Sequence, residues 1–258
     1  MKKNLNLKKR ISALVFAVVS AFLCFSGAAS KDELSAFCSN TSNRKLQIYR
    51  VERDDKTISI SFDCAWGNEY TEKILDYMDE YGVKCTFFAV SFWVEKYPDD
   101  VKNIISRGHE MGTHSKTHSY MSKLSKEKIV EELEYSCKKI EEVSGKKPLL
   151  FRPPYGDYND LLIETAAELG LYAIQWDVDS LDWKEYGAQD MLKRVLEHKN
   201  LKPGAILLFH NNTKYTAQAL DGILVGLEEM GYSIGTVSEL VLRDNYGIDA
   251  EGRQYSLS

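Results

Sequence analysis

Two histidines spaced four residues apart are the clearest chemistry-bearing feature of this 258-residue sequence. His114 and His118 lie in the segment GTHSKTH, which places both imidazoles on one side of a turn or helix. Such a pair binds a divalent metal well when a third ligand comes from elsewhere in the chain. No Glu lies inside the motif, so it is not the HExxH motif of zinc metalloproteases. The simpler interpretation is two surface histidines at chance spacing. The position of the pair in the fold must decide between this interpretation and a metal site.

Further polar residues follow segments that have the pattern of buried strands. Asp63 ends the segment TISISFD and suits a general base, whereas a helix cap is its plainer role. His210 follows AILLF and suits a general acid if a carboxylate orients it; otherwise it is a core histidine. Arg152, just before two prolines, could pair with a strand-end carboxylate or simply lie on the surface. The amide of Tyr155 is the first free donor after those prolines and a candidate oxyanion contact.

These residues require a scaffold that brings strand ends together. Strand-like and helix-like segments alternate from Thr57–Asp63 to Tyr232–Leu242, which implies parallel βα units. About seven units fit, which favours a barrel over an open doubly wound sheet. In both architectures the catalytic groups lie at the carboxyl ends of the strands. We therefore expect one rim to gather the following residues: Asp63, His114, His118, Arg152, Asp179, Asp182 and His210, with Trp66, Tyr155, Trp176 and Trp183 as aromatic rings that suit sugar stacking.

The composition and the N-terminal segment limit the possible partners and the location of the protein. A formal net charge of -5 gives no basic field for nucleic acid. Basic residues precede an apolar run that ends in small residues, so residues 1–30 are predicted to be a signal peptide or membrane anchor, with anchoring through 11–29. The protein is then secreted or held on the outer face of the cytoplasmic membrane. The predicted organisation continues with a linker at 31–55, one domain at 56–243 and a tail at 244–258.

The cysteines show no CxxC spacing. Cys137 falls on a helical apolar stripe with Ile129 and Leu133 and is predicted to fill the core. Cys64 and Cys85 lie on or beside the first two strands, and a disulfide between them is one possibility.

Five segments, taken in order, resemble the motifs of the NodB-type polysaccharide deacetylases, carbohydrate esterase family 4. They are SFD, GTHSKTH, RPPYG, DSLDW and LLFH. The resemblance extends from Lys56 to Leu242 and is greatest to the sporulation-associated and cell-wall branch. It implies a distorted (β/α)7 barrel in a single domain that removes acetyl groups from N-acetylated sugars.

The resemblance also implies a role for each matching residue. These roles are Asp63 as base, His114 and His118 as metal ligands, Arg152 as the partner of the base, Tyr155 as backbone oxyanion donor, Asp179 as the residue that tunes the acid, His210 as the acid, and Leu208 and Trp183 as walls of the acetyl pocket.

One position departs from the family pattern, because Cys64 stands where the metal-binding aspartate is expected. Cys64 could itself bind as a thiolate, in a Cys-His-His site that suits zinc. Alternatively, Asn68, Glu69 or water completes a weaker site, or metal binds poorly and activity is lost or altered. The first alternative fails if the strand continues through position 64, because the side chain then points into the barrel wall.

The predicted function is metal-assisted hydrolysis of N-acetyl groups on cell-wall polysaccharide that contains N-acetylglucosamine. The enzyme would be a hydrolase of C–N bonds other than peptide bonds, with a divalent metal, zinc, as its cofactor. An inactive, metal-poor carbohydrate-binding or spore-wall homologue is one alternative, and an O-acetyl esterase is the other. The predicted partner is a cell-wall glycan and not a nucleic acid, and the sequence does not predict the oligomeric state.

Overall fold

The strand that carries Asp63 shows why this sequence forms a buried central strand. In the computed structural model, which describes residues 45–257, strand β2 (Thr57–Cys64) is buried along almost its whole length. Side chains alternate along a strand. Ile58, Ile60, Phe62 and Cys64 therefore pack into one apolar cluster with the surrounding helices, while Ser59, Ser61 and Asp63 point to the opposite face.

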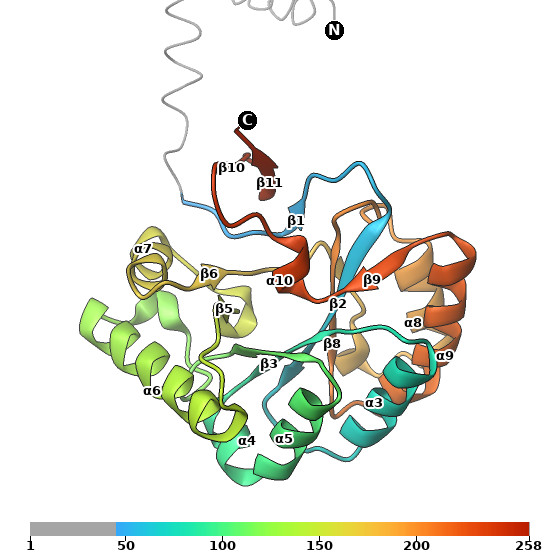
Figure 1. Cartoon of the computed structure of the whole chain (residues 1–258), viewed down its shortest axis with the longest axis horizontal. Helices are drawn as coiled ribbons and strands as arrows, with labels where there is room; N and C mark the ends of the chain where they lie inside the picture. The colour runs from blue at the N-terminus through green and yellow to red at the C-terminus, as the bar shows by residue number, and fades with distance from the viewer. Residues whose placement is uncertain (1–44, 258) are drawn as a thin grey trace, which may run out of the picture. The chain divides into compact units, whose positions relative to one another are not determined.

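Parallel strands flank β2 on both sides and form the main sheet. Its order is β6-β5-β4-β3-β2-β8-β7, and β9 pairs with the start of β2. The sheet curls into a partial barrel, with β2 and β8 near its centre (Figure 1). The predicted distorted βα barrel is confirmed. The other strands are β3 (Thr86–Ala89), β4 (Glu110–Thr113), β5 (Leu150–Phe151), β6 (Tyr172–Ala173), β7 (Val178–Asp179), β8 (Ile206–His210) and β9 (Ser233–Gly235).

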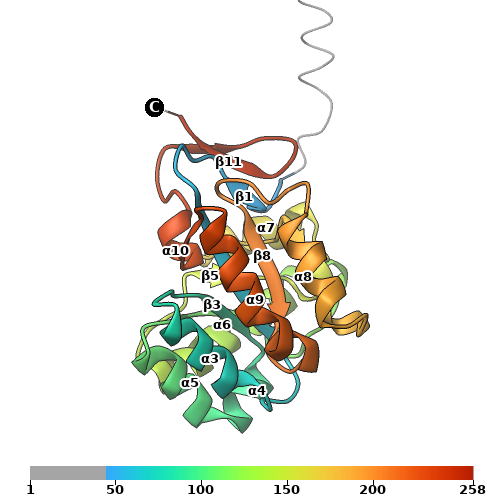
Figure 2. The same cartoon turned by 90° about the vertical axis from the view of Figure 1, so that its right-hand side faces the viewer.

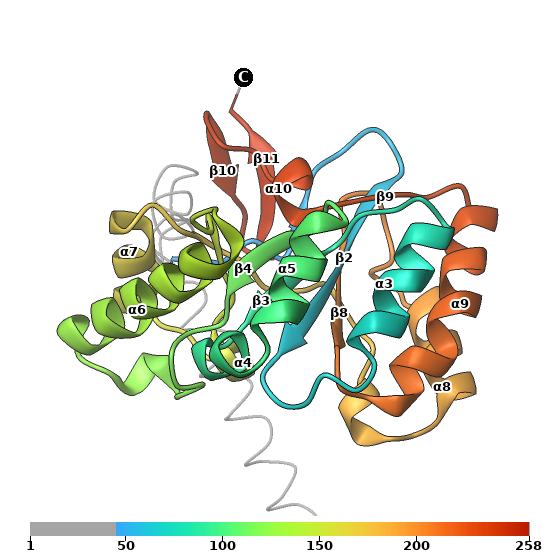
Figure 3. The same cartoon turned by 60° about the horizontal axis from the view of Figure 1, so that its bottom comes forward.

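Helices between the strands cover the outside of this sheet, as Figure 3 shows for α3 and α5 in front of β2 and β3. They are α3 (Thr71–Glu80), α4 (Ser91–Lys96), α5 (Pro98–Ser106), α6 (Lys126–Ser144), α7 (Asp160–Glu168), α8 (Ala188–Leu196), α9 (Lys214–Glu229) and α10 (Val237–Leu240). Within residues 45–257, no helix is long and apolar enough to span a membrane. The predicted leader and its apolar run at 11–29 lie outside the described residues.

A second, three-stranded sheet joins the two ends of the described chain. Its order is β1-β11-β10, formed by Arg50–Val51, Arg253–Ser256 and Tyr246–Ile248 in that order. The segment predicted as a tail at 244–258 thus contains two strands. The small sheet lies where the strands of the barrel begin, whereas β8 runs away from it toward the opposite end (Figure 2).

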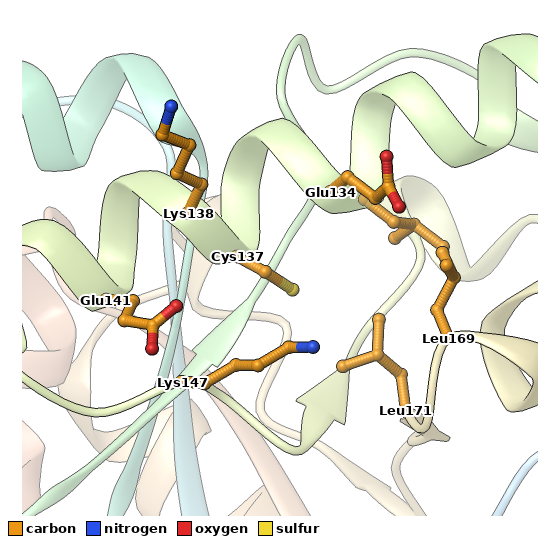
Figure 4. A pocket seen from close by; sticks show the side chains of 8 residues that line it. Glu134, Cys137, Lys138, Glu141, Lys147, Leu169 and Leu171 are labelled. Carbon is orange, nitrogen blue, oxygen red and sulfur yellow. The ribbon is translucent and has the colours of Figure 1, made fainter.

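The cysteines of the barrel are free thiols. Cys64, Cys85 and Cys137 are all buried and unbridged, so the disulfide between Cys64 and Cys85 does not form. Cys137 lies on the buried stripe of α6, as predicted. Its sulfur faces a cavity of about 220 Å³ that Leu171 and the chain of Lys147 also line (Figure 4). Burial raises the pKa of the Cys137 thiol to about 11, so this cysteine is a poor nucleophile.

We predict that the C-terminal strand β11 is needed for stability. The buried Gln254 side chain accepts a hydrogen bond from Leu242 N and donates one to Leu242 O, both at 2.8 Å. Gln254→Ala leaves both groups without these partners and should lower the free energy of unfolding by about 2 kcal/mol in urea denaturation. The control is Ser256→Ala on the same strand, which is exposed and should change it by less than about 0.5 kcal/mol. Equal stability of the two variants would contradict the prediction.

Candidate active site

The predicted site residues meet in one cavity at the carboxyl ends of β2, β4, β5 and β8. The cavity has a volume of about 800 Å³, which is within the usual size range of small-ligand sites. Arg152 is buried behind it and reaches it through Asp63. The predicted site residues that line it are Asp63, His114, His118, Tyr155, Asp179, Trp183, Leu208 and His210.

Asp63 is held by a buried arginine. Nη1 of Arg152 donates to Asp63 Oδ1 at 2.8 Å, and Nη2 donates to Ser61 Oγ at 2.8 Å. Burial opposes ionisation of Asp63, but the nearby charge of Arg152 outweighs it, and the pKa of Asp63 lies below its usual value. The carboxylate therefore stays ionised at neutral pH. Its second oxygen, Oδ2, remains directed at His114.

His114 follows the end of β4 and is buried. Its Nδ1 lies 2.7 Å from the carbonyl oxygen of Arg152, which can only accept, so Nδ1 is the donor. Burial lowers the pKa of His114, which favours the neutral ring with an unprotonated Nε2. That nitrogen lies 3.5 Å from Asp63 Oδ2.

His118 lies in a cage of rings. Its ring centroid lies 4.9 Å from those of His114 and Trp66 and 4.6 Å from that of Tyr155. Burial, followed by the charge of His114, lowers the pKa of His118 to about 4, so the ring is neutral at pH 7. Its Nδ1 is buried and has no hydrogen-bond partner among the residues that the structure describes.

A glutamate that the sequence analysis missed holds the loop between these histidines. Glu132 on α6 is almost completely buried, and its Oε2 accepts from Lys116 N at 2.9 Å and Thr117 N at 2.8 Å. Its Oε1 accepts from Thr117 Oγ1 at 2.7 Å. The signal for this role was a carboxylate on the apolar stripe of α6, beside Leu133, where a charged group needs hydrogen-bond partners.

A second pair, formed by His210 and Asp182, faces the same cavity. Oδ1 of the buried Asp182 lies 2.7 Å from His210 Nδ1, and Oδ2 accepts from His210 N at 2.6 Å and Thr216 Oγ1 at 2.6 Å. Burial opposes charging of His210, but the hydrogen bond and charge of Asp182 outweigh it and raise the pKa of His210. The imidazole is therefore held toward its protonated form.

Asp182, rather than the predicted Asp179, makes the direct contact with His210, whereas the charge of Asp179 contributes a smaller effect that also raises the pKa of His210. The Asp179 carboxylate accepts from Leu181 N at 2.8 Å, and burial raises its pKa. A short 3-10 turn, Asp182–Lys184, follows Asp179 and turns Asp182 toward His210. The sequence shows both aspartates at the strand end but not which of them the turn directs inward.

Several residues around the cavity adopt the left-handed backbone conformation, which is costly for side chains other than glycine. The φ angles are 76° for Ser115, 58° for His118, 61° for Tyr155 and 51° for Leu181. Each costs on the order of 1 kcal/mol or more, and such residues gather at functional sites. The surrounding packing must hold these loops in place.

Cys64 does not reach the cavity, so its tentative assignment as a metal ligand is wrong. Strand β2 continues through Cys64, and alternation places its side chain in the core on the same face as Phe62. Burial, followed by the charge of Asp63, raises the pKa of the thiol well above its usual value. A thiol that resists ionisation in an apolar cluster is not a metal ligand.

The residues present do not complete the metal site that the resemblance implies. His114 has the orientation of a metal ligand, because its Nδ1 donates to a carbonyl and leaves Nε2 free. His118 adds a second neutral imidazole. Nevertheless, within residues 45–257 no three His, Cys, Asp or Glu side chains are arranged so that they could hold a metal ion. The described residues thus supply two histidine donors without the third ligand that such sites normally have.

The fold and cavity define an α/β-barrel protein with the acid–base site of a hydrolase. A family model described as Polysaccharide deacetylase matches residues 50–174, which include His114 and Arg152. A peptidoglycan-N-acetylglucosamine deacetylase of Bacillus cereus is 38% identical over 198 residues, covering 75% of this chain and 92% of the relative. The chain belongs to the polysaccharide deacetylase family, of the NodB type.

Two further relatives are informative. The uncharacterized protein YlxY of Bacillus subtilis is 37% identical over 194 residues, covering 75% of this chain but only 60% of the relative. The crystal structure of a CE4 family pseudoenzyme from Bacillus anthracis has 36% identity and a TM-score of 0.72, covering 75% of this chain and 68% of that one. A mutant of that pseudoenzyme is described as having restored enzymatic activity.

We predict that metal binding does not depend on Cys64. Cys64→Ala should leave the zinc stoichiometry and affinity of the purified protein unchanged in elemental analysis and zinc titration, because the thiol faces the core. The expected cost is in stability, about 1 kcal/mol for the small cavity. His118→Ala is the comparison and should weaken whatever zinc binding the wild type has. A folded Cys64→Ala protein that has lost zinc would contradict the placement of this side chain.

We further predict that Asp182, rather than Asp179, controls the charge of His210. Asp182→Asn removes the anion that stabilises the imidazolium, so the pKa of His210 should fall and the ring should lose its proton at a lower pH. An NMR titration of the imidazole resonances measures this directly. The matched control is Asp179→Asn, which should lower the pKa of His210 by less. A larger effect from the Asp179 variant would reverse the assignment.

Proposed function

We propose that this protein hydrolyses N-acetyl groups on N-acetylglucosamine-containing cell-wall polysaccharide. The observation that supports this most directly is the pairing of opposite charge states in one cavity. Asp63 is kept ionised by Arg152, while His210 is kept toward its protonated form by Asp182. A base and an acid with pKa values moved apart are what amide hydrolysis requires at neutral pH.

The proposed reaction assigns one proton transfer to each pair. Asp63 Oδ2, the oxygen not bonded to Arg152, takes a proton from water as the water oxygen attacks the acetyl carbon. The oxyanion that forms is stabilised by the amide of Tyr155. The C–N bond then breaks, His210 gives its proton to the leaving sugar amine, and acetate is released. Each of these steps uses only side chains and backbone groups of the described residues, which do not supply a complete set of metal ligands.

The family and the walls of the cavity support this choice of substrate. Trp183 and Leu208 line the cavity and would enclose the acetyl methyl group, while exposed aromatic rings suit the apolar faces of sugars. The named relatives include peptidoglycan-N-acetylglucosamine and peptidoglycan-N-acetylmuramic acid deacetylases. Together with the predicted export segment, these names support an activity on cell-wall glycan outside the cytoplasm.

A specific observation favours a second candidate function, glycan binding without turnover. Cys64 lies in the core, and the described residues supply no third metal donor. If water activation in this site requires a metal, the chain would keep the cavity but lose catalysis. The similarity to a protein described as a pseudoenzyme supports this alternative.

Acetate release tests the proposed function. We expect the purified protein to release acetate from N-acetylglucosamine hexamer or peptidoglycan, and Asp63→Asn and His210→Ala each to lower kcat by about 10²–10⁴-fold. His198→Ala, which replaces a histidine outside the cavity, should leave kcat unchanged. Near-normal rates in either site variant would overturn the roles of Asp63 and His210. Wild-type protein without acetate release would favour glycan binding, and release from O-acetylated xylan but not from the amide substrates would indicate an esterase.

A further inference from the structure

A continuous row of aromatic rings runs from the cavity onto the surface. We name it the aromatic ridge, and it consists of Phe92, Trp66, His118, Tyr155 and Tyr120 in spatial order. The centroid separations between successive rings are 6.3, 4.9, 4.6 and 4.2 Å. Trp66, His118 and Tyr155 line the cavity, whereas the two end residues lie beyond its lining.

The ridge is exposed, although its rings are large and apolar. The exposed fractions are 59% for Trp66, 54% for Tyr155, 49% for Tyr120 and 37% for Phe92. Single exposed aromatic residues are common and need no explanation. A contiguous set beside a cavity is different, because such patches mark binding sites.

Both ends of the ridge are anchored by buried neighbours. Phe92 lies on α4, whose next residues Trp93 and Val94 are completely buried, so the helix holds the Phe92 ring outward. Tyr120 immediately precedes the buried Met121, and its ring stacks on Tyr155 at an interplanar angle of 16°. The rings are therefore pre-organised for a ligand, which limits the entropy lost on binding.

We propose that the aromatic ridge is a glycan-binding subsite that extends beyond the catalytic cavity and stacks successive sugars of a polymer. The identity of the ligand rests on the proposed function. Phe92 and Tyr120 lie outside the cavity, so they contact sugars other than the one that is deacetylated. The protein consequently acts on internal or chain-linked sugars and binds long oligomers more tightly than short ones.

The chemistry of the ridge favours a glycan over a membrane or an apolar protein surface. A sugar ring has one apolar face and a polar rim, and the ridge matches this by placing the nitrogen-bearing ring of His118 between Trp66 and Tyr155. The amine of Lys123 lies 4.8 Å from the centre of the Tyr120 ring, which adds a donor at the outer end. The ridge is also continuous with a cavity that holds hydrogen-bonding groups such as Asp179.

Binding calorimetry with N-acetylglucosamine dimer and hexamer tests the proposal. Every variant is made in the His210→Ala background, which prevents hydrolysis and leaves the buried Arg152–Asp63 ion pair intact. We expect the hexamer to bind more tightly than the dimer. Tyr120→Ala and Phe92→Ala should each weaken hexamer binding by about three- to tenfold, the usual effect of losing one aromatic contact, and dimer binding by less than about twofold. Tyr120→Phe and Phe92→Tyr keep a ring and should restore the hexamer affinity. Phe92 and Tyr120, the two ridge positions that are changed, are both exposed, so the fold should be retained.

The outcomes separate this proposal from the proposed function. Hexamer affinity that is unchanged in both alanine variants, or a parent protein that binds the hexamer no better than the dimer, overturns the ridge as a subsite. Failure of the phenylalanine variant to restore binding overturns stacking as its basis. The binding assay requires no turnover. If the wild-type protein releases no acetate but hexamer binding still depends on the ridge, only the deacetylase activity is refuted.

Discussion

The buried ion pair between Arg152 and Asp63 is the interaction on which the geometry of the site depends. Removing two charges from water costs free energy that only close geometry and further hydrogen bonds offset. Arg152 meets this requirement by donating to both Asp63 and Ser61 on β2. Its backbone carbonyl also accepts from His114 after β4, so one residue links the base, the first histidine and two strands. Removal of either charge would leave the other buried and uncompensated, at a cost of about 3–5 kcal/mol.

Fixed charged partners determine how the charges of the cavity are distributed. Asp63 is ionised because a cation, Arg152, is fixed beside it, and His210 is held toward its charged form because an anion, Asp182, is fixed beside it. For His114 and His118, no neighbouring charge is strong enough to offset the effect of burial, which lowers the pKa of both rings, so both stay neutral. A site with an ionised carboxylate as base and an imidazole held toward its protonated form as acid can separate the removal of a proton from its delivery, which a single titrating group cannot do.

The parts of this arrangement that follow from periodicity and strand order could be predicted from the sequence. Alternating βα segments predicted the curled barrel, and the position of Asp63 and His210 at strand ends predicted their convergence. The predictions that the structure corrected depended on the direction in which a side chain points at the end of a strand or within a single turn. Position 64 reaches the cavity only if β2 ends before it, and only tertiary pairing with β3 shows that the strand continues. The choice between Asp179 and Asp182 likewise depends on a 3-10 turn that no local pattern specifies.

The two ends of the aromatic ridge and the acid–base pairs depend on different elements of this fold. Phe92 and Tyr120 are supported by α4 and by the segment around Met121, whereas the acid–base pairs depend on β2, β8 and the turn after β7. The side chain at position 64 faces the core, so a change there acts on the packing of β2 and leaves the supports of both ridge ends in place. If turnover requires a metal, a donor set without the expected aspartate would weaken turnover without removing glycan recognition. Such a separation is consistent with relatives that include both a protein named as a deacetylase and one described as a pseudoenzyme.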